Sequence, residues 1–485
     1  MPKPNDRTHN GGRYLQGISI WALSLGCIIG WGSFVMPGTS FLPDSGPVGS
    51  LIGIVLAALM CFVICSNYSF LVQKIPSSGG SYGFTRSILG EDHGFLAVWS
   101  LELAYISLLW ANSTAFILLG RYLVGDFLQW GFHYTIAAYD VWAGEVLVTI
   151  LIQVIFGLVT CFGKHFANIL RTVFATVMFL GVCILFAGVC YKNGFSLIFR
   201  PAFSSGENHL IQILNVAVLA PWMYVGFEVV VHSVDEVRFP LKNIFRYAGF
   251  AIFAGMLIYL FLNLTASSGV PEGFENWSDY VSNLENCTGI ESIPVLFNIN
   301  RALGKTGLVI AAITIFCALA SSVMGFLRAG ARVLTFMAEA KIVPEKLATF
   351  NKNGLPVKAT LVILVISLPV SFLGRTAIGW NADVATLSVS IVYAYISICT
   401  VLSAKGKENK KARILGIIGA FCSALVFFFL LIPNIFAVNA LSKESYLMLA
   451  LWSFVGILFY WHTFSRDKEY RFGKQQLRRL VPGKD

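Results

Sequence analysis

Charged side chains are scarce in this sequence. Asp, Glu, Lys and Arg make up 12% of the 485 residues, about half the share that soluble proteins carry. Hydrophobic residues make up 56%, and the mean hydropathy is +0.72. A water-soluble fold could not bury so much apolar surface, so a polytopic membrane protein is predicted. Nucleic-acid binding is not expected despite the net charge of +10, because the cations lie in short loops and tails and not on one solvated face.

Clustered cysteines and catalytic motifs are also lacking. The ten cysteines occur singly, without a CxxC pair or a Cys/His cluster, and are expected to pack as small hydrophobic side chains. Gly304-Lys305-Thr306 resembles the end of a phosphate loop, but Ile299 stands where the loop requires an earlier glycine. No Ser/His/Asp arrangement stands out. We therefore predict no enzymatic activity, no metal and no other cofactor.

Long apolar runs are abundant. Residues 1–13 are polar and lack the apolar core of a cleavable signal, so the first apolar segment is expected to remain in the mature protein. A helix needs about 20 apolar residues to span a bilayer. By this measure the chain is all-α with 12 transmembrane helices, at about 16–42, 47–73, 94–124, 142–162, 166–190, 210–235, 245–268, 303–337, 357–374, 381–403, 412–434 and 444–464.

The basic residues predict the orientation of these spans. With twelve spans, 26 Lys and Arg residues fall on the side of the termini and 7 on the opposite side. This asymmetry predicts that both termini are cytoplasmic, most simply in a plasma (inner) membrane. The expected organisation is a cytoplasmic tail (1–15), a ten-helix transport core (16–403), two additional helices (404–464) and a basic cytoplasmic tail (465–485).

Two of the spans contain residues that disfavour a continuous helix. The first carries Gly30 and Gly32, and the sixth carries Pro221, Gly226 and the carboxylate of Glu228. Backbone groups freed from a helix in hydrocarbon are costly unless they line a cavity. Broken first and sixth helices are typical of transporters built from two inverted five-helix repeats, although two kinked packing helices would give the same pattern.

Four motifs occur in order along the chain. They are Ile29-Gly30-Trp31-Gly32-Ser33-Phe34, Ile75-Pro76-Ser77-Ser78-Gly79-Gly80-Ser81-Tyr82, Tyr224-Val225-Gly226-Phe227-Glu228 with Asp235-Glu236 and Pro240-Leu241-Lys242-Asn243, and Ala331-Arg332-Val333-Leu334 through Val343-Pro344. Together they resemble the motifs of a known family, the amino acid permeases of the amino acid–polyamine–organocation (APC) superfamily. The resemblance implies a 5+5 inverted-repeat core of the leucine-transporter type. Trp31 replaces a usually small residue, Ser33 replaces isoleucine, and the fifth helix lacks a mid-depth lysine. These departures leave the substrate class and the coupling ion open.

The first broken helix predicts a receptor for a zwitterion. The amides of Gly32, Ser33 and Phe34 begin the outer half-helix, a positive dipole end suited to a carboxylate. Carbonyls before the break and near Ala220 could accept hydrogen bonds from an ammonium. The predicted substrate-binding residues are Ile29, Gly30, Trp31, Gly32, Ser33, Phe34, Ala220, Trp222, Tyr224 and Phe227.

Glu228 and two serines are the candidate ion sites. A carboxylate near the membrane midplane is a functional candidate by default, so Glu228 could carry a proton, pair with a cationic substrate, or form a structural hydrogen bond to the broken first helix. In the wider superfamily, paired hydroxyls like those of Ser321 and Ser322 can bind sodium together with first-helix carbonyls, here those of Gly26 and Ile29. Serine pairs also serve ordinary helix packing.

Helix geometry suggests one further pair. Glu102 and Arg328 are expected at similar depths, roughly 12–15 Å into the membrane from the cytoplasmic end, in the third and eighth helices, which the family resemblance implies are neighbours. Because an unpaired charge is costly there, we predict a Glu102–Arg328 ion pair that serves as a scaffold strut or an inner gate.

The predicted function is secondary active transport of an amino acid or a close relative, coupled to sodium, to protons or to exchange. One alternative is an amine or polyamine exchanger in which Glu228 binds the cation. Another is a membrane sensor that binds the same ligand without transporting it. The expected partners are the small-molecule substrate, the coupling ion and the bilayer, with no nucleic acid and no obligate protein partner.

Overall fold

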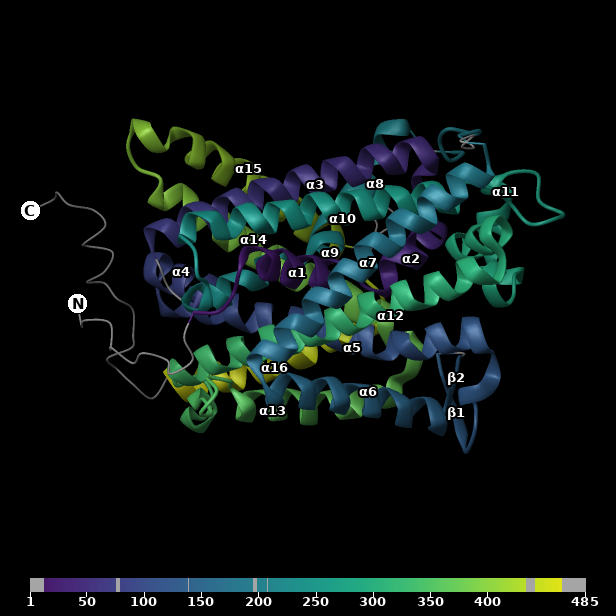
Figure 1. Cartoon of the computed structure of the whole chain (residues 1–485). Coiled ribbons are helices and arrows are strands. Elements are labelled where there is room, and N and C mark those ends of the chain that lie inside the picture. The colour runs from purple at the N-terminus through teal and green to yellow at the C-terminus, as the bar shows by residue number, and fades with distance from the viewer. Residues whose placement is uncertain are drawn as a thin grey trace, which may run out of the picture.

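A computed structural model describes residues 13–75, 79–137, 139–194, 199–206, 208–432 and 441–464. Most of the predicted N-terminal tail, the whole predicted C-terminal tail, and Pro76, Ser77 and Ser78 of the second motif lie outside these residues. The long helices run roughly parallel across Figure 1, with α4 at one end and the β1–β2 hairpin and α11 at the other. The predicted all-α membrane architecture is confirmed.

The α-helices and strands follow one another along the chain with short 3₁₀ turns between many of them. Their bounds are α1 Gly17–Ile28, α2 Trp31–Met36, α3 Leu42–Lys74, α4 Gly80–Leu89, α5 Glu91–Val124, β1 His133–Ile136, β2 Tyr139–Trp142, α6 Ala143–Phe162, α7 Lys164–Lys192, α8 His209–Ala217, α9 Ala220–Tyr224, α10 Ile244–Ala266, α11 Trp277–Ser282, α12 Pro294–Glu339, α13 Val357–Ser367, α14 Ala377–Ser403, α15 Lys410–Leu431 and α16 Lys443–Phe464.

Ten helices in the described residues are long and apolar enough to cross a membrane. The stretch 357–403 counts as one of them, yet it is more than twice the length that one span needs. Gly374 within it has φ +65°, where the chain bends inside the 3₁₀ segment η8 Leu368–Thr376, just before α14 begins at Ala377. The predicted count of twelve therefore stays a prediction, because it depends on how such bent segments are divided.

Helix α5 forms the centre of the molecule. All of its side chains from Ala97 to Leu119 are buried, and it packs against both α12 and α14. Helix α12 in turn packs against α7. Helix α16, in contrast, is largely exposed. The predicted proximity of the third and eighth spans is therefore present in the α5–α12 contact.

The hairpin was not expected from the sequence. Strands β1 and β2 pair antiparallel, with His133 opposite Trp142. They connect α5 to α6 at the end of the molecule opposite α4 (Figure 1). Four-residue strands carry too few alternating side chains to be recognised by periodicity.

Candidate functional site

The first helix is interrupted at Ile29 and Gly30. Helix α1 ends at Ile28, the next two residues are extended, and α2 begins at Trp31. The break is stabilised from α5, because Asn112 Oδ1 accepts a hydrogen bond of 3.2 Å from the Trp31 N–H. Beyond Met36 the helical backbone continues through the π-helical segment η1 Pro37–Phe41 into α3.

The sixth helix is interrupted at Val225 and Gly226. Helix α9 ends at Tyr224, and Gly226 has φ +108°, a conformation that side chains with a Cβ rarely adopt. The chain then continues as the 3₁₀ segment η3 Phe227–Glu236.

The Glu228 carboxylate fixes this second break. Its Oε2 accepts hydrogen bonds from the Gly226 N–H and the Tyr393 hydroxyl, both at 3.0 Å, and its Oε1 accepts one from Tyr105 at 3.2 Å. Glu228 is fully buried. The proton-coupling role remains a prediction, while the observed contacts tie the broken backbone to α5 and α14.

The two breaks touch each other. A Cβ built on Gly226 would lie 2.3 Å from the Cβ of Cys27, and one built on Gly32 would lie 2.3 Å from Cζ2 of Trp222. Ser24 Oγ also donates to the Phe227 carbonyl at 3.2 Å. The glycines thus permit a close approach that larger residues would prevent.

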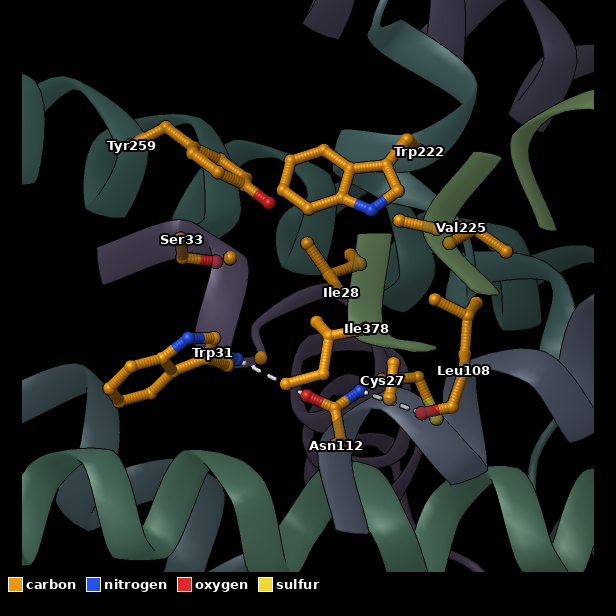
Figure 2. Close-up of a pocket in the computed structure, with 14 residues that line it drawn as sticks. Cys27, Ile28, Trp31, Ser33, Leu108, Asn112, Trp222, Val225, Tyr259 and Ile378 are labelled. Atoms are coloured by element: carbon orange, nitrogen blue, oxygen red, sulfur yellow. Dashed lines mark hydrogen bonds between the residues drawn. The ribbon is translucent and has the colours of Figure 1, made fainter. Parts of the chain in front are cut away.

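A small cavity, about 50 Å³ in volume, lies between the breaks. Figure 2 shows Trp222 and Tyr259 on one side of it and Trp31 and Asn112 on the other. Its lining consists of Cys27, Ile28, Gly30, Trp31, Gly32, Ser33, Leu108, Ala111, Asn112, Trp222, Val225, Tyr259, Ile378 and Ala382. None of these described residues carries a formal charge at neutral pH.

The predicted binding residues divide into two groups. Gly30, Trp31, Gly32, Ser33 and Trp222 line the cavity.

The others, Ile29, Phe34, Ala220, Tyr224 and Phe227, are buried outside the cavity lining. The Tyr224 hydroxyl donates to the Ile54 carbonyl, and Phe227 packs against Tyr68 and Tyr393. Sequence reasoning missed Asn112 and Tyr259, of which only Asn112, a polar residue inside the third span, gave a signal.

The candidate sodium residues lie beside the first helix. A Cβ built on Gly26 would lie 1.9 Å from Ser321 Oγ, so the two helices are in close contact at this point. The hydroxyl oxygens of Ser321 and Ser322 are buried and have no hydrogen-bond partner among the described residues. This geometry leaves both oxygens available to a ligand.

On the side where the described chain begins, an ionic network joins three parts of the structure. Arg328 and Arg332 both form ion pairs with Glu236, and Arg328 Nη1 donates to the Tyr14 hydroxyl at 2.9 Å. The amides of Tyr14 and Leu15 donate to the Glu236 carbonyl at 2.8 and 2.9 Å. The network therefore links the start of the first helix to the end of the sixth and to α12. We call these five residues the terminal-side network.

The predicted Glu102–Arg328 ion pair is wrong. Arg328 pairs with Glu236 instead, while neither carboxylate oxygen of Glu102 has a hydrogen-bond partner among the described residues. Glu102 lies near Gly330, where a built Cβ would be 3.5 Å from its Oε1. Positions 328 and 330 point in directions about 200° apart around a helix. The two helices are neighbours as predicted, but Glu102 faces the side of α12 that carries Gly330 and not the side that carries Arg328.

Comparison with known proteins agrees with this fold and these breaks. The methylthioribose transporter of Bacillus subtilis is 26% identical over 310 residues, covering 62% of this chain and 64% of its own. The vacuolar cationic amino acid transporter 4 of Arabidopsis thaliana is 23% identical over 413 residues, covering 82% and 64%. The branched-chain amino acid permease BcaP of Bacillus subtilis is 24% identical, covering 61% and 63%. The chain thus spans a little under two thirds of the length of these curated relatives.

A solved structure shares the fold. It is a Na⁺-coupled sialic acid symporter in a substrate-bound, outward-open state, with a TM-score of 0.53 and 12% sequence identity, covering 87% of this chain and 91% of that one. The amino acid permease family description matches residues 15–460. The chain therefore belongs to the amino acid permease family, of the APC type that its motifs predicted.

Proposed function

We propose that the protein is a secondary transporter that moves a small neutral amino acid by alternating access. The observation that carries this proposal is the meeting of the two helix breaks at one cavity whose described lining holds no charged side chain. A zwitterion brings its own pair of charges, and such a site can hold both with backbone dipoles alone.

The two ends of the substrate would meet different parts of the cavity. The amides at the start of α2, around Gly32, would receive the carboxylate, and the carbonyls freed at the breaks would receive the ammonium. The Trp31 N–H already donates to Asn112 and the Ser33 N–H to the Gly30 carbonyl, so the Gly32 amide between them would be the donor for the substrate. Trp31 and Trp222 restrict the space for the side chain, which favours small substrates.

The contacts of Glu228 argue against the alternative function, an amine or polyamine exchanger in which Glu228 binds the cationic substrate. Glu228 does not line the cavity, and three protein donors already occupy its oxygens. A cationic substrate would have to displace these donors and disrupt the second break.

Ligand-induced thermal stabilisation of the purified protein tests the substrate class. We expect small neutral amino acids to raise the melting temperature, since a ligand at 100 times its Kd stabilises a protein by about 2.7 kcal/mol. Lysine, arginine and diamines are expected to have no effect. In the Gly32→Ala variant the shift should disappear, because the new Cβ meets the Trp222 ring. The matched variant Gly379→Ala, where no atom lies within 4 Å of the new Cβ, should keep it.

Two outcomes would favour one of the alternative functions. If a diamine gave the largest rise in melting temperature, the amine or polyamine exchanger would be favoured. Stabilisation by a neutral amino acid without its uptake into proteoliposomes would favour the sensor.

We further propose that sodium, bound by Ser321 and Ser322 with first-helix carbonyls, drives the uptake. The buried hydroxyl oxygens without partners beside Gly26 support this. Replacing both serines by alanine should lower sodium-dependent uptake at least about tenfold, equivalent to about 1.4 kcal/mol of lost ion binding. The measurement is uptake into proteoliposomes across a sodium gradient.

Ser423→Ala provides the matched control, because Ser423 on α15 is likewise buried with an unpartnered hydroxyl but lies outside the proposed site. Its uptake should stay unchanged. Equal uptake by the wild type in sodium-free choline buffer, driven by a pH gradient, would instead assign the coupling to Glu228 and protons.

A further inference from the structure

A second cavity lies on the side of the terminal-side network and shares no residue with the substrate cavity. Four helices form it. Thr160 comes from the end of α6, Lys164 and Arg171 from α7, Arg328 and Arg332 from α12, and Thr360 from α13. Figure 1 shows α6 beside α13, a pair that also forms direct contacts. We call this space the basic cavity, because four of its lining residues are cations and none of those described is acidic.

Arg171 is the unusual member of this lining. Its side chain is 2% exposed, and its Nε and Nη2 atoms have no hydrogen-bond partner among the described residues. Lys164 and Arg171 are seven residues apart, so both lie on the same face of α7. A buried guanidinium with two nitrogens that lack hydrogen-bond partners is costly in a membrane protein. A ligand that satisfied its donors would therefore stabilise the folded protein.

The carboxylates near the cavity act on Arg328 and Arg332 and not on Arg171. Glu236 pairs with both Arg328 and Arg332. Asp235 and Glu339 act electrostatically on Arg332. Arg171 itself experiences the positive charge of Arg328. The charge at the Arg171 end of the cavity is therefore not balanced by the described side chains.

We propose that the basic cavity binds a phosphate-type anion, with the Arg171 guanidinium as its main donor. The planar guanidinium offers paired N–H groups that match the oxygens of a phosphate. Two helices, α7 and α13, begin at the cavity, at Lys164 and Val357, and their N-terminal dipoles favour an anion there. Basic pockets between transmembrane helices are a recognised place for lipid phosphate groups. The anion is either free phosphate or the phosphate of an anionic lipid.

The bound anion would also act on the terminal-side network. Arg328 lines the basic cavity and at the same time bonds Tyr14 and Glu236. An anion between Arg171 and Arg328 offsets their mutual repulsion and holds α7 against α12. The site thereby stabilises the state in which this side is closed.

The test uses the purified full-length protein and needs no transport measurement. In detergent, the melting temperature is followed as phosphate replaces gluconate at constant pH and ionic strength. In nanodiscs, lipids with an anionic phosphate headgroup are compared with zwitterionic ones. At least one of the two sources of phosphate should raise the melting temperature of the wild type by at least about 2 °C in a saturable manner. Arg171→Gln should abolish this rise, whereas Arg413→Gln, which removes an exposed cation of α15, should retain it.

The outcomes decide both the existence and the source of the ligand. A rise with phosphate in detergent assigns free phosphate, and a rise only with anionic lipid assigns the lipid. No saturable rise in the wild type with either source overturns the proposal, even if Arg171→Gln does not fold. An equal rise in the wild type and in Arg171→Gln overturns it as well.

Discussion

Uptake by the Gly226→Ala variant is expected to be at least about tenfold lower than that of the wild type. Gly226 has φ +108°, and a Cβ there would lie 2.3 Å from the Cβ of Cys27. The left-handed backbone costs other residues about 1–2 kcal/mol, and the clash falls on an atom fixed to the main chain. The two breaks must therefore move apart, which displaces the cavity walls. Uptake into proteoliposomes measures the effect.

Alanine variants at two further glycines separate the cost of the left-handed backbone from the cost of the steric clash. Gly304 has φ +62°, but no atom lies within 4 Å of a Cβ built on it. Gly304→Ala therefore carries the backbone penalty alone, and Gly379→Ala carries neither penalty. Both should transport nearly as well as the wild type, with size-exclusion profiles confirming that all three variants fold. If Gly226→Ala transported like Gly304→Ala, close contact between the breaks would not be required for function.

The helix breaks could be predicted from sequence because their causes are local. Gly30, Pro221 and Gly226 disfavour a continuous helix whatever surrounds them, and the structure interrupts the helices at Ile29–Gly30 and Val225–Gly226. The composition of the chain likewise determines that the helices must lie in a membrane. Neither inference needs to know which residues face one another.

The cavity lining and the ion pairs depend on helix rotation, which sequence spacing does not give. Tyr259 faces the cavity from α10, although nothing in its span distinguishes it. The position of Glu236 at the end of the sixth span predicts a gate or loop ion pair with a basic residue, but it does not identify the partners, Arg328 and Arg332, to which the 3₁₀ segment η3 carries it. Glu102 has the right depth for Arg328 but lies beside Gly330. Depth along a helix can be estimated from 1.5 Å per residue, whereas the partner depends on rotation as well.

Neutralising Glu236 and neutralising Glu102 should therefore affect the free energy of unfolding to very different extents. Glu236→Gln should lower the free energy of unfolding by about 3 kcal/mol, because it leaves two largely buried arginines without their carboxylate. Glu102→Gln should change it by less than about 1 kcal/mol, since neither oxygen of that carboxylate has a partner among the described residues to lose. Thermal unfolding of the purified variants in one detergent gives the comparison.

A double-mutant cycle then identifies the partner of Arg328. If Arg328 is paired with Glu236, the double variant Glu236→Gln/Arg328→Gln should be less destabilised than the sum of the two single changes by about 1 kcal/mol or more. The same cycle with Glu102 should be additive within about 0.5 kcal/mol. If the Glu102 cycle showed coupling and the Glu236 cycle were additive, Glu102 would be the partner of Arg328, as its depth in the membrane first suggested. The coupling to Glu236 matters beyond stability, because its carbonyl also accepts the Tyr14 and Leu15 amides. If the protein works by the proposed alternating access, opening this side would have to break the contacts that join the first helix, the sixth helix and α12.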